Sequence, residues 1–158
     1  MPSYKVHLVG GVATYTILYG LLPLVIPTIP TGLRYYVMWL GFALLGSIFP
    51  DIDVYSKMQQ VLFRSLLVLL PCMLYLRYLK AFIGLGIVTG LCVCIRHRTI
   101  THHIGFLFAC AVAGSLLVIQ QNPHLTLAAA VCGIQFFFGA VSHVVLDIGL
   151  KKALFIRK

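Results

Sequence analysis

The sequence predicts an all-α integral membrane protein, a bundle of about six transmembrane helices with a polar metal site at one membrane face. Composition is the first indication, since 61% of the 158 residues are hydrophobic and 9% are charged, against roughly 45–50% and 25% in soluble domains. The second is that the apolar residues form runs near the ~20-residue length of a membrane-spanning helix. The third is that the acidic residues, and the histidines other than His124, lie at those ends of the apolar runs that are expected on the same side of the membrane.

The amount of apolar sequence excludes a soluble enzyme. A soluble chain this short could not bury so much apolar surface, because small domains keep a large surface relative to their volume. The helical runs leave no room for a separate soluble domain, so residues 1–158 are expected to form a single transmembrane helical domain. All five cysteines lie within apolar runs, where unpaired cysteine behaves as a small hydrophobic residue, and we expect no disulfide framework.

The first three predicted helices cover residues 6–26, 35–50 and 61–76. The first follows Lys5 and is interpreted as a retained helix rather than a signal peptide, because no convincing small-residue cleavage site follows it. Residues 27–32, rich in proline, threonine and glycine, predict a turn. The polar residues 51–60 separate the second helix from the third.

The last three predicted helices cover residues 81–95, 104–119 and 125–146. Residues 77–80 form a short turn before the fourth helix, and the polar residues 96–103 separate the fourth from the fifth. Pro123 lies in the turn before the sixth helix. Several runs are short for a hydrocarbon core of ~30 Å, so the third and fourth helices could instead form a partly inserted hairpin.

The distribution of basic residues predicts the orientation in the membrane. With six spans, the N-terminus, residues 51–60, residues 96–103 and the C-terminal tail lie on one side. That side holds every lysine and arginine except Arg34, Arg77 and Lys80. The positive-inside rule therefore predicts a protein of the inner (cytoplasmic) membrane with both termini in the cytoplasm. Membrane lipids are the expected partners, because basic residues attract anionic headgroups.

The same side also gathers the residues that can bind a metal ion. These residues are His7, Asp51, Asp53, His97, His102, His103, His143 and Asp147. Ionisable groups near a bilayer are costly and need partners. A mixed set of carboxylates and imidazoles suits zinc, manganese or iron, whereas carboxylates and water alone would suit magnesium. The sequence therefore predicts a divalent metal site, with zinc as the first choice, on the cytoplasmic side.

Local spacings support such a site. His143 and Asp147 are four residues apart and share one face of a helix. Asp51 and Asp53 follow the end of the second helix, where an extended backbone would place both carboxylates on one side. The glycine pair at residues 10–11 lies one turn after His7 and would let another helix approach closely.

Four motifs carry a resemblance to a known family. They are His7 near the N-terminus, Phe49-Pro50-Asp51-Ile52-Asp53, His97-Arg98-Thr99-Ile100-Thr101-His102, and Ser142-His143-Val144-Val145-Leu146-Asp147. In this order, over nearly the whole chain, they resemble the YdjM-like family of membrane-bound, metal-dependent hydrolases.

The resemblance implies a set of metal ligands, which comprises His7, Asp51, Asp53, His97, His102, His143 and Asp147. The sequence departs from the family pattern at three positions. Val54 stands where the family usually has histidine, Thr99 where it has glycine, and His103 where it has serine. His103 could compensate for the histidine missing at position 54. These departures bear on the number of metal ions and on the fit of the substrate.

The leading hypothesis for function is a metal-dependent hydrolase that acts on a phosphoester, in a lipid or a lipid-linked phosphate, at the cytoplasmic membrane surface. A divalent metal would activate water and polarise the phosphoryl oxygen. Asp51 and Asp53 are the candidate catalytic carboxylates, and Asp51, Asp53 or Asp147 could bridge metal ions or accept a proton. Arg98, and with less support Arg96, would hold the phosphate, because a guanidinium matches phosphate geometry. Alternatively, Arg96 and Arg98 only anchor the protein at the cytoplasmic face of the membrane.

Two other functions remain open at this point. A transporter of a metal ion or small solute would place ionisable groups near the bilayer midplane, where this sequence has only neutral polar residues such as Gln135. A non-catalytic scaffold would hold a structural metal in a closed site. Nucleic acid is not expected as a partner, because no basic and aromatic surface stands outside the helices. The sequence does not predict the oligomeric state.

Overall fold

The computed structural model describes residues 4–30, 32–53, 57–75, 77, 79–94 and 101–148. The described residues form helices α1 (Tyr4–Val25), α2 (Leu33–Ile48), η1 (Phe49–Asp53), α3 (Lys57–Tyr75), α4 (Leu79–Cys94), α5 (Ile104–Gln121), η2 (Pro123–Leu125) and α6 (Thr126–Ile148). Here η marks a 3-10 helix, and none of these residues is in a β-strand. The predicted all-α fold is confirmed, and the bounds of each α-helix agree with the apolar runs to within a few residues.

Within the described part of the chain, four helical stretches are long and apolar enough to cross a membrane: Tyr4–Val25, Leu33–Asp51, Ile104–Gln121 and Pro123–Asp147. The apolar part of α3, Leu62–Tyr75, is shorter, and the 16 residues of α4 extend over about 24 Å. Large apolar side chains point outward, for example Leu24 (78% exposed) and Leu67 (73% exposed). Such surfaces fit a lipid environment, whose chains are as apolar as leucine.

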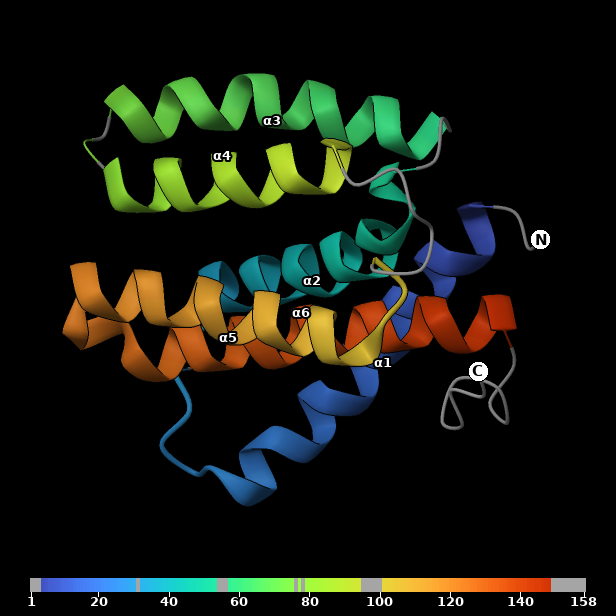
Figure 1. The fold of residues 1–158 in the computed structure, drawn as a ribbon. Helices are drawn as coiled ribbons and strands as arrows, with labels where there is room; N and C mark the ends of the chain where they lie inside the picture. The colour runs from blue at the N-terminus through green and yellow to red at the C-terminus, as the bar shows by residue number, and fades with distance from the viewer. Residues whose placement is uncertain are drawn as a thin grey trace.

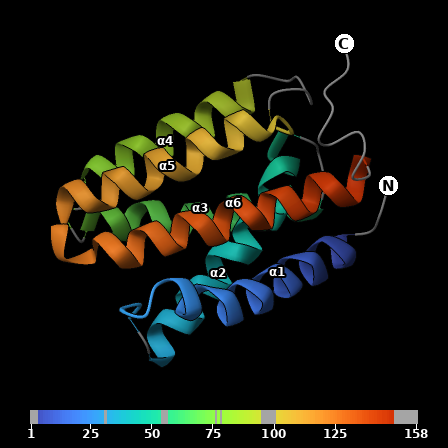
Figure 2. The same cartoon turned by 90° about the horizontal axis from the view of Figure 1, so that it is seen from below.

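The helices pack in three groups (Figure 1). The α3–α4 hairpin lies on one side of the bundle, α2, α5 and α6 form the middle, and α1 lies on the far side against α2 and α6. Figure 2 shows the same arrangement from below, with α5 beside α4 and α1 beside α2. The start of α1, η1, the start of α5 and the end of α6 all lie at one end of the bundle. The described members of the predicted site therefore lie at this end of the bundle: His7, Asp51, His102, His143 and Asp147.

The closest helix contact joins α2 to α6 through two glycines. A Cβ built on Gly46 would collide with the backbone of Phe136, and a Cβ built on Gly139 would collide with the backbone of Ala43. Each glycine thus admits the backbone of the other helix. Within a membrane, helices associate by van der Waals packing rather than by the hydrophobic effect, and small residues permit this close approach. The α2–α6 pair is therefore the central contact of the bundle.

Helix α1 packs against α2 and α6 through Gly10 and Gly11, the glycines predicted to allow close approach, near the end of the bundle that holds the site residues. A Cβ on Gly11 would lie 2.7 Å from Ser47 Oγ, and one on Gly10 would lie 2.9 Å from a methyl group of Leu146. The expectation that these glycines allow close helix packing beside His7 is confirmed.

One local expectation was wrong. The segment around Asp51 is not extended but forms the 3-10 helix η1, which continues directly from α2. Pro50 is compatible with this turn because its ring fixes φ near −65°, a helical value. Residues two apart on a 3-10 helix point about 120° apart, so an extended-strand argument does not apply to Asp51 and Asp53.

The glycine contact predicts a clear difference between two alanine variants of α2. Gly46→Ala should destabilise the fold by about 1–3 kcal/mol, because overpacking a close contact forces backbone shifts. Gly41→Ala should be neutral or slightly stabilising, because no described atom lies within 4 Å of a Cβ at this position and alanine favours helix. Thermal unfolding of both variants in detergent measures the difference. Equal melting temperatures would contradict the assigned contact.

Candidate metal centre

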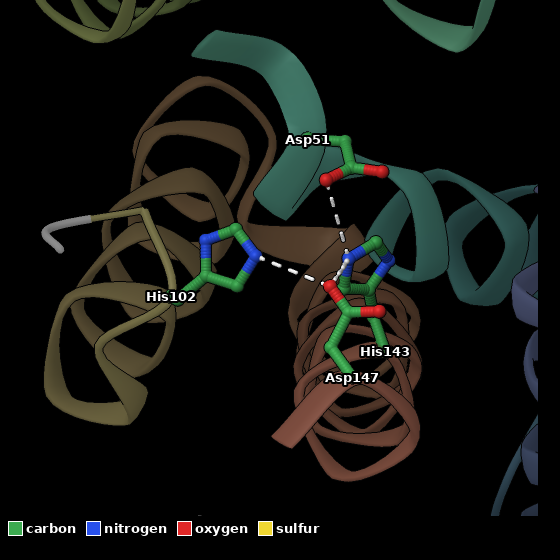
Figure 3. A group of neighbouring side chains, drawn as sticks. All are labelled: Asp51, His102, His143 and Asp147. Atoms are coloured by element: carbon green, nitrogen blue, oxygen red, sulfur yellow. Dashed lines mark ion pairs between the residues drawn. The ribbon is translucent and has the colours of Figure 1, made fainter. Parts of the chain in front are cut away.

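Four potential ligands converge at one end of the bundle (Figure 3). Asp51 comes from η1, His102 from the turn before α5, and His143 and Asp147 from the last turns of α6. One ligand atom from each of the four lies within 4.8 Å of the others. His143 and Asp147 are four residues apart, as predicted, whereas Asp51 and His102 are distant from them in sequence. The packing of α2, α5 and α6 brings the four residues together.

A backbone hydrogen bond orients His143. Its Nδ1 lies 2.6 Å from the carbonyl oxygen of Ser47, at the end of α2. A carbonyl oxygen can only accept, so Nδ1 carries the proton and Nε2 of the neutral ring presents a lone pair. Nε2 is buried and has no hydrogen-bond partner among the described residues. Metal-binding histidines are commonly held in this way, by a backbone carbonyl on the second ring nitrogen.

The spacing of the ligand atoms fits a small tetrahedral cation. His143 Nε2 lies 3.5 Å from an oxygen of Asp51 and 3.5 Å from Asp147 Oδ2, and His102 Nε2 lies 3.7 Å from the same Asp147 oxygen. Zinc bonds of about 2.0–2.1 Å place neighbouring ligands of a tetrahedron about 3.3–3.4 Å apart. These three separations are slightly wider than these values, and the other pairs of ligand atoms lie within 4.8 Å of each other. Direct hydrogen bonds would be clearly shorter than the three measured separations. A buried group of aspartate and histidine residues that could hold a metal ion is therefore present.

His7 lies directly beside these four residues. Its ring stacks on the ring of His143, with centroids 3.9 Å apart and planes inclined by 19°. Its Nε2 approaches the second oxygen of Asp147, Oδ1, at 3.3 Å. Neither this oxygen nor His7 Nδ1 has a hydrogen-bond partner among the described residues. His7 can therefore orient Asp147 or serve as a further ligand through Nε2.

Burial and charge make a cation a suitable occupant. The side chains of His143 and Asp147 are 1% and 7% exposed, whereas Asp51 is 21% exposed. The carboxylates of Asp51 and Asp147 repel each other, because they lie close together where few water molecules can reach them. A divalent cation would balance both charges and use the lone pair of His143. Asp51 lies on the more accessible side of the group, which is the side that a substrate or water could reach.

Of the other predicted site residues, some lie outside this group and some lie outside the described part of the structure. Asp53 is the last residue of η1, and its side chain lies outside the described part of the structure, as do His97, Arg96 and Arg98. His103 precedes α5 and is exposed. His124 is exposed in η2, in agreement with its interpretation as a loop residue. The predicted ligand roles of Asp53 and His97 stay predictions.

Sequence reasoning missed two groups that support the site. The carbonyl of Ser47 orients His143, and the Thr101 hydroxyl lies 3.2 Å from Nδ1 of His102. A backbone carbonyl leaves no signature in a sequence, so Ser47 could not have been found. Thr101 immediately precedes His102, so a contact between their side chains could have been predicted from the sequence.

The fold and the site define a helical integral membrane protein with a candidate metal centre at one end of its bundle. Residues 1–153 match the family model described as YdjM inner membrane protein, so the chain belongs to the YdjM family of inner membrane proteins. This confirms the family resemblance carried by the four motifs. Searches of curated proteins and of solved structures found no match.

The adjacent histidines of the turn before α5 provide a matched pair for a test of the centre. His102→Gln should weaken zinc binding at least about tenfold, because it removes one nitrogen ligand. His103→Gln should leave binding unchanged, because His103 is exposed and outside the group. Zinc titration of both purified variants, followed by metal analysis, measures the effect. Equal affinities in the two variants would remove His102 from the centre.

Proposed function

We propose that this protein is a membrane-bound, metal-dependent hydrolase of phosphoesters, acting on a lipid or a lipid-linked phosphate at the cytoplasmic membrane surface. The observation that carries the proposal is the convergence of Asp51, His102, His143 and Asp147. His143 Nε2 lies 3.5 Å from an oxygen of each aspartate and has no hydrogen-bond partner among the described residues. Zinc is the preferred ion, because imidazole ligands favour it over magnesium; manganese and iron are the alternatives with the same donor set.

The position of the centre supports a reaction at the membrane surface. All four residues lie where α2 and α6 end and α5 begins, and these helices are among those able to cross the membrane. The excess of basic residues on this side supports a cytoplasmic orientation. Lipid phosphates lie in the headgroup region next to the hydrocarbon core. The ends of spanning helices are expected in the same region, so substrate and centre would meet without either leaving the membrane.

The chemistry needed is a displacement at phosphorus. When bound, a divalent cation supplies a Lewis acid that activates water and polarises a phosphoryl oxygen. Hydrolysis forms a bond from the water oxygen to phosphorus and breaks the ester bond, while the water proton is transferred to the leaving alcohol. Asp51 is the proposed proton acceptor, because it is the most exposed carboxylate of the group. We also propose Arg98 as the phosphate-binding residue and Asp53 as a second catalytic carboxylate that could bridge metal ions or accept the proton.

The centre distinguishes this proposal from transport. A carrier would be expected to hold its ionisable groups near the bilayer midplane, whereas the four ligand candidates lie at the ends of helices. The partial exposure of Asp51 beside buried partners supports an accessible position at the centre, and a purely structural site is usually closed. These two features favour catalysis over a carrier or a scaffold.

Hydrolysis by the purified protein tests the proposal. Zinc-loaded protein in vesicles is expected to cleave phosphatidylglycerol or a water-soluble nitrophenyl phosphodiester, and a chelator should abolish cleavage until zinc is restored. Asp51→Asn should lower kcat by about 10²-fold or more, as expected for loss of a general base. His124→Gln, altered in the exposed η2 turn, should match the wild type. Turnover that survives the chelator, or no turnover with any divalent ion, would contradict the proposal.

A further inference from the structure

An apolar cavity of about 570 Å³ lies inside the bundle. Its lining residues come from α3 and α4 on one side and from α2, α5 and α6 on the other, and the cavity is partly open to the surroundings of the bundle. Figure 1 shows how these helices are arranged. Its volume lies within the range of about 300–1,000 Å³ that is typical of ligand sites. The catalytic proposal makes no use of this space.

The cavity is shaped for a long, narrow hydrocarbon. On α2 its lining runs from Arg34 to η1, where it ends at Phe49, a rise of about 22 Å. This exceeds the ~15 Å depth of one leaflet of the hydrocarbon core. Small residues provide the width, among them Ala111, Gly114 and Gly133.

Few of the groups that line the cavity are polar. Arg34 is the one charged residue among the described residues that line the cavity, and it lies at the end far from the metal centre. The hydroxyl of Ser115 is directed at the carbonyl oxygens of Ala111 and Ala129, at 2.9 and 3.0 Å. Water needs two to four polar partners to occupy a cavity stably, so an apolar occupant is favoured. In a bilayer the abundant apolar molecules are lipid chains.

One end of the cavity lies on the same two elements, η1 and α6, that carry three of the four candidate ligands. Phe49 lines one end and lies two residues before Asp51. Phe136 lines the same end and precedes His143 and Asp147 by seven and eleven residues, which are close to two and three whole helical turns. The rings of Phe49 and Phe136 meet edge to face, with centroids 5.2 Å apart. This aromatic pair therefore stands between the apolar cavity and the polar ligands.

We infer that the cavity binds a hydrocarbon chain of a membrane phospholipid whose phosphate is presented to the metal centre. This inference rests on the proposed function for the role of the phosphate, and on the cavity itself for the chain. The substrate class is then a phospholipid held by one chain inside the bundle. The Phe49–Phe136 pair would contact the substrate where the chain meets the headgroup.

Filling the cavity provides the variant for a test. Gly114 lines the cavity, and no described atom lies within 4 Å of a Cβ built on it. The side chain of Gly114→Leu should therefore start in open space and reduce the cavity, and leucine favours helix over glycine. Gly86→Leu is the matched control, because Gly86 has the same open surroundings and does not line the cavity.

The experiment uses a phosphatidylglycerol probe with a photoactivatable diazirine in the middle of one acyl chain. The zinc-loaded, full-length protein is placed in phosphatidylcholine vesicles containing a small fraction of the probe, irradiated, and mapped by peptide mass spectrometry. Labels are expected on cavity residues such as Met38, Cys110 and Cys132. Gly114→Leu should lower this labelling severalfold, and Gly86→Leu should leave it unchanged. Labels confined to outward-facing residues, or unchanged by Gly114→Leu, would overturn the inference.

Two further measurements separate this inference from the catalytic proposal. Gly114→Leu should keep its zinc and its turnover of the soluble phosphodiester while losing turnover of phosphatidylglycerol. Cavity labelling without any hydrolysis would support the lipid-binding cavity and contradict the hydrolase. Hydrolysis of both substrates that Gly114→Leu leaves intact would support the hydrolase and overturn the role of the cavity.

Discussion

The close contact between α2 and α6 is the constraint on which the rest of the structure depends. Gly46 and Gly139 let each helix approach the backbone of the other, and Ser47 and His143 follow these glycines by one and four residues. The Ser47 carbonyl is thereby placed 2.6 Å from Nδ1 of His143. A helix contact made for packing thus also fixes the ring orientation of a candidate ligand and, in the neutral ring, which nitrogen carries the proton.

The bundle separates a polar end from an apolar interior. His143 is buried beneath His7, and Asp147 is held between three histidine rings. One helical turn before His143, Ala140 is fully buried, and the aromatic pair Phe49–Phe136 follows deeper in the bundle. Ionisable groups are costly within a membrane unless they are paired, and their collection at the helix ends limits this cost. Substrate chemistry and lipid contact can therefore occupy neighbouring regions of one small bundle.

Much of the fold could be predicted from the sequence, because membrane helices must satisfy their backbone hydrogen bonds internally and must be apolar over their length. Asp51, His102, His143 and Asp147 could be predicted as neighbours because topology brings their helix ends to one face. The stacking of His7 on His143 could not be predicted, because it depends on how deeply α1 packs against Ser47 and Leu146. The 3-10 turn at Asp51 and the internal cavity likewise follow from tertiary packing, which periodicity does not encode.

Zinc K-edge X-ray absorption spectroscopy of the purified, zinc-loaded protein tests most directly whether this end of the bundle is a metal centre. The structure predicts nitrogen and oxygen ligands at about 2.0–2.2 Å, with no sulfur near 2.3 Å, because the group holds imidazoles and carboxylates. Multiple scattering from at least two imidazole rings should also appear, and should weaken when His143 is replaced by glutamine. A spectrum dominated by sulfur, or one without imidazole scattering, would contradict the account.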